Sequence, residues 1–125
     1  MHLRARDLRV LVVDDERLVA DSLVMILKAE GYKATAVYSG ECAVQAAKEQ
    51  EPDVLISDVV MGSMTGIEAA NEILKIAPDC RVLLVSGQIM TADLLKNAEM
   101  QGYRFEVVPK PVHPRVLLEY LDKYA

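Results

Sequence analysis

Carboxylates collect where two apolar runs of this chain end. The run Val10–Val13 leads directly into Asp14 and Asp15, and the run Val54–Ile56 is followed by Ser57 and Asp58. Short apolar runs that contain β-branched residues predict strands buried on both faces, which belong to parallel sheets. The carboxyl ends of such strands lie at one edge of the sheet, where open α/β folds bind their ligands. We therefore expect Asp14, Asp15 and Asp58 to gather at this edge.

Acids gathered in this way predict a metal site. Carboxylates within a few ångströms of one another repel, and each raises the pKa of its neighbours. A divalent cation removes that cost, and a set of oxygen ligands without His or Cys selects a hard ion, Mg²⁺ first. Mg²⁺ keeps several waters and prefers carboxylates together with a phosphate oxygen. The acids therefore indicate Mg²⁺ as the cofactor and a phosphate group as the second ligand.

Two further strand ends carry groups suited to a phosphate. Ser86 ends the apolar run 82–85, and Lys110 follows the run 105–109. A lysine supplies a point charge, and a serine hydroxyl can donate a hydrogen bond to a phosphate oxygen. A carboxylate can be the nucleophile in phosphoryl transfer, which gives an acyl phosphate. Asp58 stands alone at its strand end, so we predict that it faces the phosphate while the other acids hold the metal.

Strands and helices alternate along the chain. We predict strands at 10–13, 33–37, 54–58, 81–86 and 105–109, and helices at about 17–30, 40–50, 67–77, 91–101 and 114–124. This alternation indicates a doubly wound α/β fold, with a five-stranded parallel sheet in the flavodoxin-like order 2-1-3-4-5 and helices on both faces. Pro109 fits an edge strand. The inner face of the first helix is predicted to consist of Leu18, Val19, Ser22, Leu23, Ile26 and Leu27.

Composition limits the classes of function. The chain has 125 residues, which predicts a single domain with residues 1–7 as a short leading arm. No apolar run approaches the roughly 20 residues of a membrane helix, and the basic start lacks the apolar segment of a signal peptide, so we expect a cytoplasmic protein. The net charge of −5, without a basic stripe, argues against direct binding to nucleic acid or a membrane. Cys42 and Cys80 show no metal or disulfide spacing.

In order and spacing, these motifs resemble the receiver domain of bacterial response regulators. The motifs are Asp14-Asp15, Asp58, Ser86-Gly87 and Lys110-Pro111, and they extend over nearly the whole chain. The resemblance implies that Asp58 accepts a phosphoryl group from a histidine kinase or a phosphotransfer protein. It implies that Asp15, Asp58 and the main-chain carbonyl of Val60 bind Mg²⁺ directly, with Asp14 acting through water. Lys110 would contact the phosphate, and Ser86 would swing toward it on activation.

The resemblance also draws attention to the positions around the acceptor and the lysine. It implies a cis peptide at Lys110-Pro111, which proline permits, and Gly66 matches the family. The family commonly has proline four residues after the acceptor, where this chain has Gly62, so we expect a looser loop. An aromatic usually stands three residues before the lysine, where this chain has Val107. Phe105 shares its strand parity, and Tyr103 is also near.

A third position affects the lifetime of a phosphorylated state. Val60, two residues after the acceptor, offers no side-chain amide to position a hydrolytic water. We therefore expect a longer-lived acyl phosphate than in relatives with a polar residue at this position.

The expected output is a change in a partner-binding face. Ser86 and Lys110 lie on the fourth and fifth strands, so a phosphate would pull on the face made by the helix at 91–101, the strand at 105–109 and the helix at 114–124. This face would bind an effector, by a monomer or by a phosphorylation-dependent dimer. The chain is not expected to be an enzyme beyond catalysing its own phosphorylation and dephosphorylation.

Other functional classes explain the same residues less well. A degenerate receiver would act only as a protein-docking module. An aspartyl-phosphate phosphohydrolase would place two acids as D-x-D after the first strand, whereas Asp14 and Asp15 are adjacent. A flavin-binding module would need an uncharged phosphate loop at the same place, because carboxylates repel a phosphate.

Overall fold

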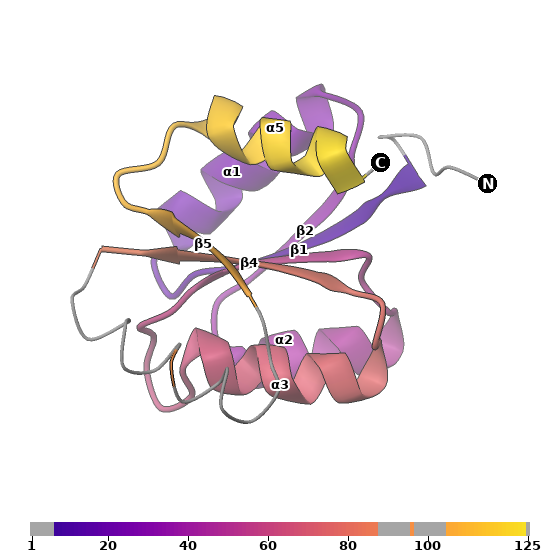
Figure 1. Cartoon of the computed structure of the whole chain (residues 1–125), viewed down its shortest axis with the longest axis vertical. Coiled ribbons are helices and arrows are strands. Elements are labelled where there is room, and N and C mark those ends of the chain that lie inside the picture. The colour runs from indigo at the N-terminus through magenta and orange to yellow at the C-terminus, as the bar shows by residue number, and fades with distance from the viewer. Residues whose placement is uncertain (1–6, 88–95, 97–104, 125) are drawn as a thin grey trace.

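A five-stranded parallel sheet forms the centre of the computed structural model, which describes residues 7–87, 96 and 105–124 (Figure 1). The strand order is β2-β1-β3-β4-β5, as the alternation of elements predicts. The strands are β1 (Arg9–Val13), β2 (Lys33–Val37), β3 (Val54–Asp58), β4 (Arg81–Ser86) and β5 (Glu106–Pro109). The described helices are α1 (Arg17–Ala29), α2 (Gly40–Glu49), α3 (Gly66–Ile76) and α5 (Pro114–Tyr124).

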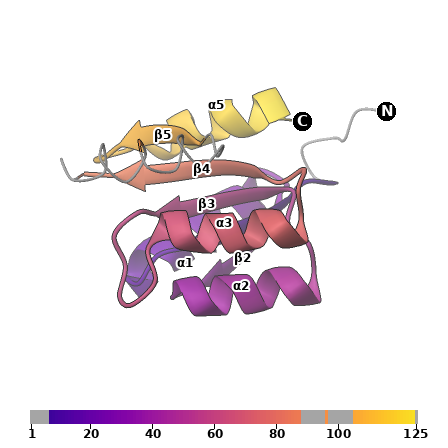
Figure 2. The ribbon, with the colours of Figure 1, turned by 60° about the horizontal axis from the view of Figure 1, so that its bottom comes forward.

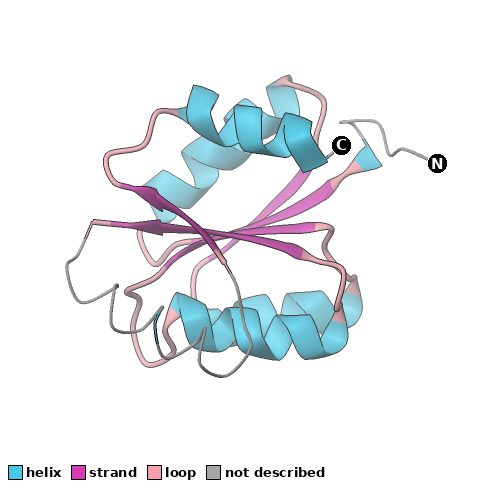
Figure 3. Ribbon diagram, viewed as in Figure 1, coloured by secondary structure: helices cyan, strands magenta, loops and turns pink. Residues whose placement is uncertain are grey.

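Helices cover both faces of this sheet. Figures 1 and 2 show α1 and α5 on one face and α2 and α3 on the other, and Figure 3 shows the strands as a single layer between them. Alternate strand residues enter the two hydrophobic clusters: Val12 and Ile56 face α1 and α5, while Leu11 and Leu55 face α2 and α3. The central strands are therefore buried on both sides, which explains their continuous apolar runs.

The strand register brings the polar strand ends to one level. Val13 pairs with Ser57, so Asp14 and Asp58 follow at the same height along β1 and β3. Ser86 pairs with Pro109, which places Lys110 directly after the last pair of β4 and β5. Parallel strands share one direction, and all four ends therefore meet at the carboxyl edge of the sheet.

Local signals begin and end the helices. Ser39 caps α2 by accepting a hydrogen bond from the Cys42 N–H at 3.1 Å, and Gly31, with φ of 94°, follows α1, both as expected from the sequence. Thr65 and Glu68 form a reciprocal capping box at the start of α3. The capping box fixes where the chain leaves the loop that follows Asp58.

The predicted inner face of α1 is wrong in part. Leu27 is buried and Leu23 packs against the core, but Leu18 is 80% exposed, Val19 is 45% exposed and Ser22 is exposed. The buried residues are Ala20, Val24 and Leu27. Nine of the 13 residues of this helix are apolar, so periodicity alone permits more than one inward face, and packing against the sheet and α5 selects among them.

Several predictions fall outside the described residues. These are the helix at 91–101 except for Lys96, Tyr103, and all of the leading arm except Asp7. Within the described ranges, no helix has the length and apolar character needed to cross a bilayer. Cys42 and Cys80 are both free thiols.

Candidate functional site

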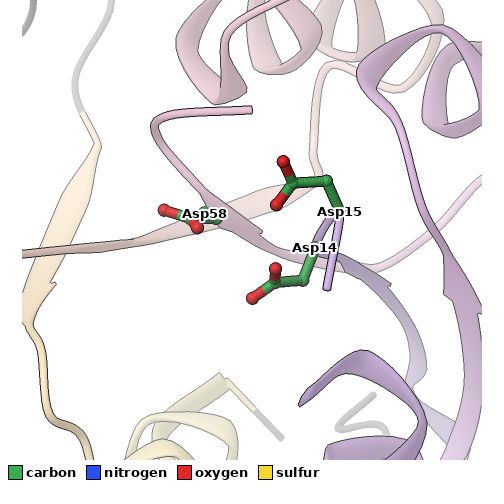
Figure 4. A group of neighbouring side chains, drawn as sticks. All are labelled: Asp14, Asp15 and Asp58. Carbon is green, nitrogen blue, oxygen red and sulfur yellow. The ribbon is translucent and has the colours of Figure 1, made fainter. Parts of the chain in front are cut away.

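Three carboxylates meet at the carboxyl edge of the sheet. One oxygen from each of Asp14, Asp15 and Asp58 lies within 4.8 Å of the other two. In Figure 4 the side chains of Asp14 and Asp15, at the end of β1, point toward Asp58 at the end of β3. The spacing suits one hard cation bound by several oxygen ligands. The structure thus brings together the three acids that the sequence singles out.

Asp14 is the buried member of this cluster. It is 6% exposed, and its Oδ1 accepts a hydrogen bond from the Glu16 N–H at 2.9 Å. Burial raises the pKa of Asp14, and the charges of Asp58 and Asp15 raise it further, against the hydrogen bond and Lys110, which lower it. A bound dication would relieve the same repulsion, and the chemistry of the donor set therefore fits Mg²⁺.

Lys110 is the cation of the site. Its Nζ donates to Asp58 Oδ2 at 2.8 Å, and the two side chains are 38% and 12% exposed. Burial alone would lower the pKa of Lys110, but the hydrogen bond and charge of Asp58, with Asp14 and Glu16, raise it. Lys110 is therefore a permanent positive charge, and it holds one oxygen of Asp58 and leaves the other available.

The main chain fixes the position of Lys110. Its N–H donates to the Ser86 carbonyl at 2.8 Å, and its peptide bond to Pro111 is cis, as the sequence resemblance implies. Ser86 is 8% exposed. A Cβ at Gly87 would lie 3.4 Å from the Lys110 Cβ, which is an ordinary contact. These contacts place Ser86 and Gly87 beside the lysine.

An apolar cavity of about 560 Å³ opens next to the acids. Gly87 and Pro111 line it with Asp14, Asp58 and Lys110, and the rest of its wall is apolar, including Val12, Ile56 and Leu117. The cavity lies on the face of the sheet that α1 and α5 cover. The charged groups of the site therefore border a weakly polar space, in which their interactions are stronger than in water.

The loop after Asp58 passes very close to the acceptor. An added Cβ at Gly66 would lie 2.1 Å from the Asp58 carbonyl oxygen, so only glycine fits there. The Gly66 N–H donates to the Val59 carbonyl at 2.8 Å and closes the loop. Gly62, in contrast, has no atom within 4 Å of an added Cβ, and Val60 is 43% exposed. The Val60 carbonyl as a metal ligand stays a prediction.

The aliphatic residue in place of the expected aromatic packs inside the fold. Val107 is partly buried and pairs with Leu84, and both belong to the hydrophobic cluster on the α2 and α3 side. Phe105 packs against the same cluster, in agreement with the shared parity. Neither side chain faces the cavity beside Asp58.

Glu16 is a charged neighbour to which the sequence reasoning assigned no role. Its carboxylate contributes to the raised pKa of Lys110, and its N–H binds Asp14. The available signal was the uninterrupted acidic run Asp14-Asp15-Glu16. Glu16 is the N-cap residue of α1, just after β1, and its charge acts on Lys110, which follows β5.

Comparison with known proteins gives matches along nearly the whole chain. A family model described as "Response regulator receiver domain" matches residues 10–122. The chemotaxis protein CheY of Thermotoga maritima is 34% identical over 118 residues, which are 94% of this chain and 97% of that protein.

Longer relatives and solved structures match as well. "Probable transcriptional regulatory protein TcrX" of Mycobacterium tuberculosis is 32% identical over 108 residues, which are 86% of this chain and 46% of that protein. The chain thus spans about half the length of that relative. The structure of the chemotaxis protein CheY4 of Vibrio cholerae superposes with a TM-score of 0.82 at 25% identity, and covers 94% of this chain and 98% of that one.

Proposed function

Because this chain belongs to the family of response regulator receiver domains, we propose that it is a signalling switch that accepts a phosphoryl group on Asp58. The family acts in two-component signalling, as switches rather than as enzymes. It binds Mg²⁺ in an acidic pocket and interacts with histidine kinases and effectors. The observation that supports the role of Asp58 best is its contact with Lys110 within the group of three acids.

Asp58 has the surroundings of a nucleophile. Lys110 holds its Oδ2 at 2.8 Å, which leaves Oδ1 to attack phosphorus. As the new O–P bond forms, the P–N bond of a partner's phosphohistidine breaks, and the imidazole leaves with the electron pair. The product is an acyl phosphate on Asp58. Lys110 then contacts the phosphate, and the Ser86 hydroxyl donates to one of its oxygens.

Asp14, Asp15, Asp58 and the Val60 carbonyl are the proposed metal ligands, with Asp14 acting through water. The close approach of the three carboxylates supports this assignment. When bound, Mg²⁺ neutralises charge on the acids and on the transferring phosphoryl group. The acids would hold that ion beside Asp58, and the buried position of Asp14 keeps their geometry fixed.

The output depends on the elements that carry Ser86 and Lys110. Movement of Ser86, together with the proposed switch positions Gly87, Val107 and Pro111, would change the face of β5 and α5 and of the helix predicted at 91–101. We assign this face to an unidentified effector, with monomeric or phosphorylation-dependent dimeric binding. The phosphodonor is a histidine kinase or a phosphotransfer protein, and the expected location is the cytoplasm.

Incubation with acetyl phosphate and Mg²⁺, followed by intact mass measurement, tests the proposal. The wild-type chain should gain one phosphoryl group, and Asp58→Asn should gain none. Asp79→Asn, which removes an exposed acid from the opposite end of the sheet, should behave as wild type. No gain in the wild type would overturn the proposal in favour of a docking module. Steady phosphate release from several phosphate esters would indicate a phosphohydrolase.

A further inference from the structure

The loop between β3 and α3 leans on the first turn of α2. This loop runs from Val59 to Thr65 and contains Val60, whose carbonyl is a proposed metal ligand. Gly62 lies in its middle, in open space and without the stiffness of a proline. The shape of the loop must therefore come from what it touches.

One of these contacts joins Met64 to Gly40. A Cβ added at Gly40 would lie 2.9 Å from both Cβ and Cγ of Met64 and 3.0 Å from its Sδ. The Cγ and Sδ can rotate away, but the Cβ of Met64 moves only with the main chain. Any side chain at position 40 therefore displaces the loop itself, and glycine lets helix and loop touch.

A hydrogen bond between the sequence neighbours of these two residues adds to this contact. The Ser63 hydroxyl donates to Glu41 Oε2 at 2.6 Å. The far end of the loop is fixed separately, by the Thr65 and Glu68 capping box and by Gly66 against the Asp58 carbonyl. The loop is thus held by α3 at one end and by α2 near its tip.

We propose that Gly40 and Glu41 are positioning residues for the metal and phosphoryl site, and that they act through Met64 and Ser63. In this chain, the first turn of α2 does for the loop what a proline four residues after the acceptor would do by chain stiffness. This inference rests on the proposed function, because it assigns the purpose of the loop to the site at Asp58. It makes a surface on α2, away from the acids, a control point for metal affinity.

The first test measures Mg²⁺ affinity by calorimetry, beside hydrogen exchange of the loop amides. Gly40→Ala should weaken Mg²⁺ binding about tenfold, and Ser63→Ala about threefold. Both variants should speed exchange in residues 60–64 and leave the interior of α2 protected. Lys48→Ala, an exposed change in the last turn of the same helix, is the matched control and should alter neither quantity.

The second test asks whether stiffness can replace the contact. Position 62 suits a proline in three respects: an added Cβ meets nothing within 4 Å, the φ of Gly62 is not positive, and in the described residues no hydrogen bond uses its N–H. In the Ser63→Ala background, Gly62→Pro should restore most of the lost Mg²⁺ affinity. A purely local effect of the serine would not be rescued in this way.

The outcomes separate this inference from the proposed function. If Ser63→Ala and Gly40→Ala bind Mg²⁺ and exchange their loop amides as the wild type does, α2 positions nothing and the inference fails, whether or not Asp58 takes a phosphoryl group. If the wild type takes no phosphoryl group but the variants still lose Mg²⁺ affinity, the proposed function fails and the positioning role of α2 remains.

Discussion

The two ends of the sheet treat charge in opposite ways. At the amino end, charged and polar groups are paired: Asp53 Oδ2 accepts from the Arg9 N–H at 2.9 Å, and the Tyr32 hydroxyl donates to Asp122 at 3.0 Å. Arg81 lies over the ring of Tyr124, whose hydroxyl donates to Glu106. At the carboxyl end, three acids face one another, and among the described groups Lys110 contacts only one of them directly.

The amino end of the sheet therefore contributes to stability, whereas the carboxyl end carries the candidate functional site. Paired groups at the amino end lower the free energy of the folded chain. The acids at the carboxyl end raise it, and they are tolerated because strands buried on both faces hold them in place. Replacing an aspartate by asparagine should therefore change the stability of the chain with opposite signs at the two ends.

The largest expected effect concerns the tight packing beside the acceptor. Gly66→Ala should lower the free energy of unfolding by about 3 kcal/mol, because its Cβ would lie 2.1 Å from the Asp58 carbonyl oxygen. Urea unfolding measures this change. Gly62→Ala, in the same loop but in open space, should change stability by less than about 1 kcal/mol. Similar losses in both variants would contradict the close approach at Gly66.

Asp14→Asn should stabilise the chain at pH 7 in the absence of metal. The pKa of Asp14 is raised by burial and by its acidic neighbours, so the ionised group costs folding free energy at neutral pH. That cost is relieved as the pH falls through the raised pKa and is gone below the ordinary value of 3.8. The gain should therefore shrink on acidification, which urea unfolding between pH 7 and 3.5 can follow.

The amino end supplies the matched control for Asp14. Asp53→Asn weakens the hydrogen bond from the Arg9 N–H and should destabilise the chain at pH 7. The comparison between the two ends would be wrong if both aspartate substitutions changed stability in the same direction.

Tyr32→Phe should cost about 1 kcal/mol, because it removes the hydroxyl that donates to Asp122 from a side chain that is 5% exposed. Burial and this hydrogen bond raise the pKa of Tyr32 from 10 to about 12. The stabilisation is full below pH 10 and is lost as the pH rises toward 12. The wild type should therefore lose more stability than the variant over this range in denaturant titrations. Parallel curves would show that Tyr32 is not linked to alkaline unfolding.

The smallest effect is kinetic and concerns the exposed side of the acceptor loop. Val60 is 43% exposed and has no polar group to orient water. Val60→Asn should speed the decay of the phosphorylated chain about threefold, which corresponds to about 0.7 kcal/mol in the barrier. Intact mass against time after removal of the phosphodonor measures the decay. Equal decay rates for the wild type and the variant would contradict the prediction that Val60 prolongs the phosphorylated state.

The strand order of the sheet was predictable because continuous apolar runs indicate which strands are buried on both faces. Four-residue apolar runs such as Val10–Val13 and Val82–Val85 cannot be exposed on either face, and short helical connections leave few topologies. The rotation of α1 was not predictable. Leu18 and Ala20 are both apolar, but Leu18 is 80% exposed and Ala20 is fully buried, and nothing in the local sequence distinguishes the two positions.

The site, like the fold, has features that the sequence predicts and features that it does not. Asp14, Asp58, Ser86 and Lys110 were found because each ends a strand, and strand ends converge. The contact between Met64 and Gly40 joins two residues 24 positions apart, and no pattern in the sequence around either residue predicts it. Position 62 predicted a loop without stiffness, but only the packing of α2 shows what holds it.

The pairing of Val13 with Ser57 has a consequence for how the chain can change in length. Side chains alternate between the two faces of a strand, so one residue inserted within β3 would turn Asp58 toward the helices of the opposite layer. One residue inserted ahead of Pro52, outside the strand, would leave the alignment intact. Insertions and deletions should therefore accumulate in the connections of this chain and be absent from β1 and β3.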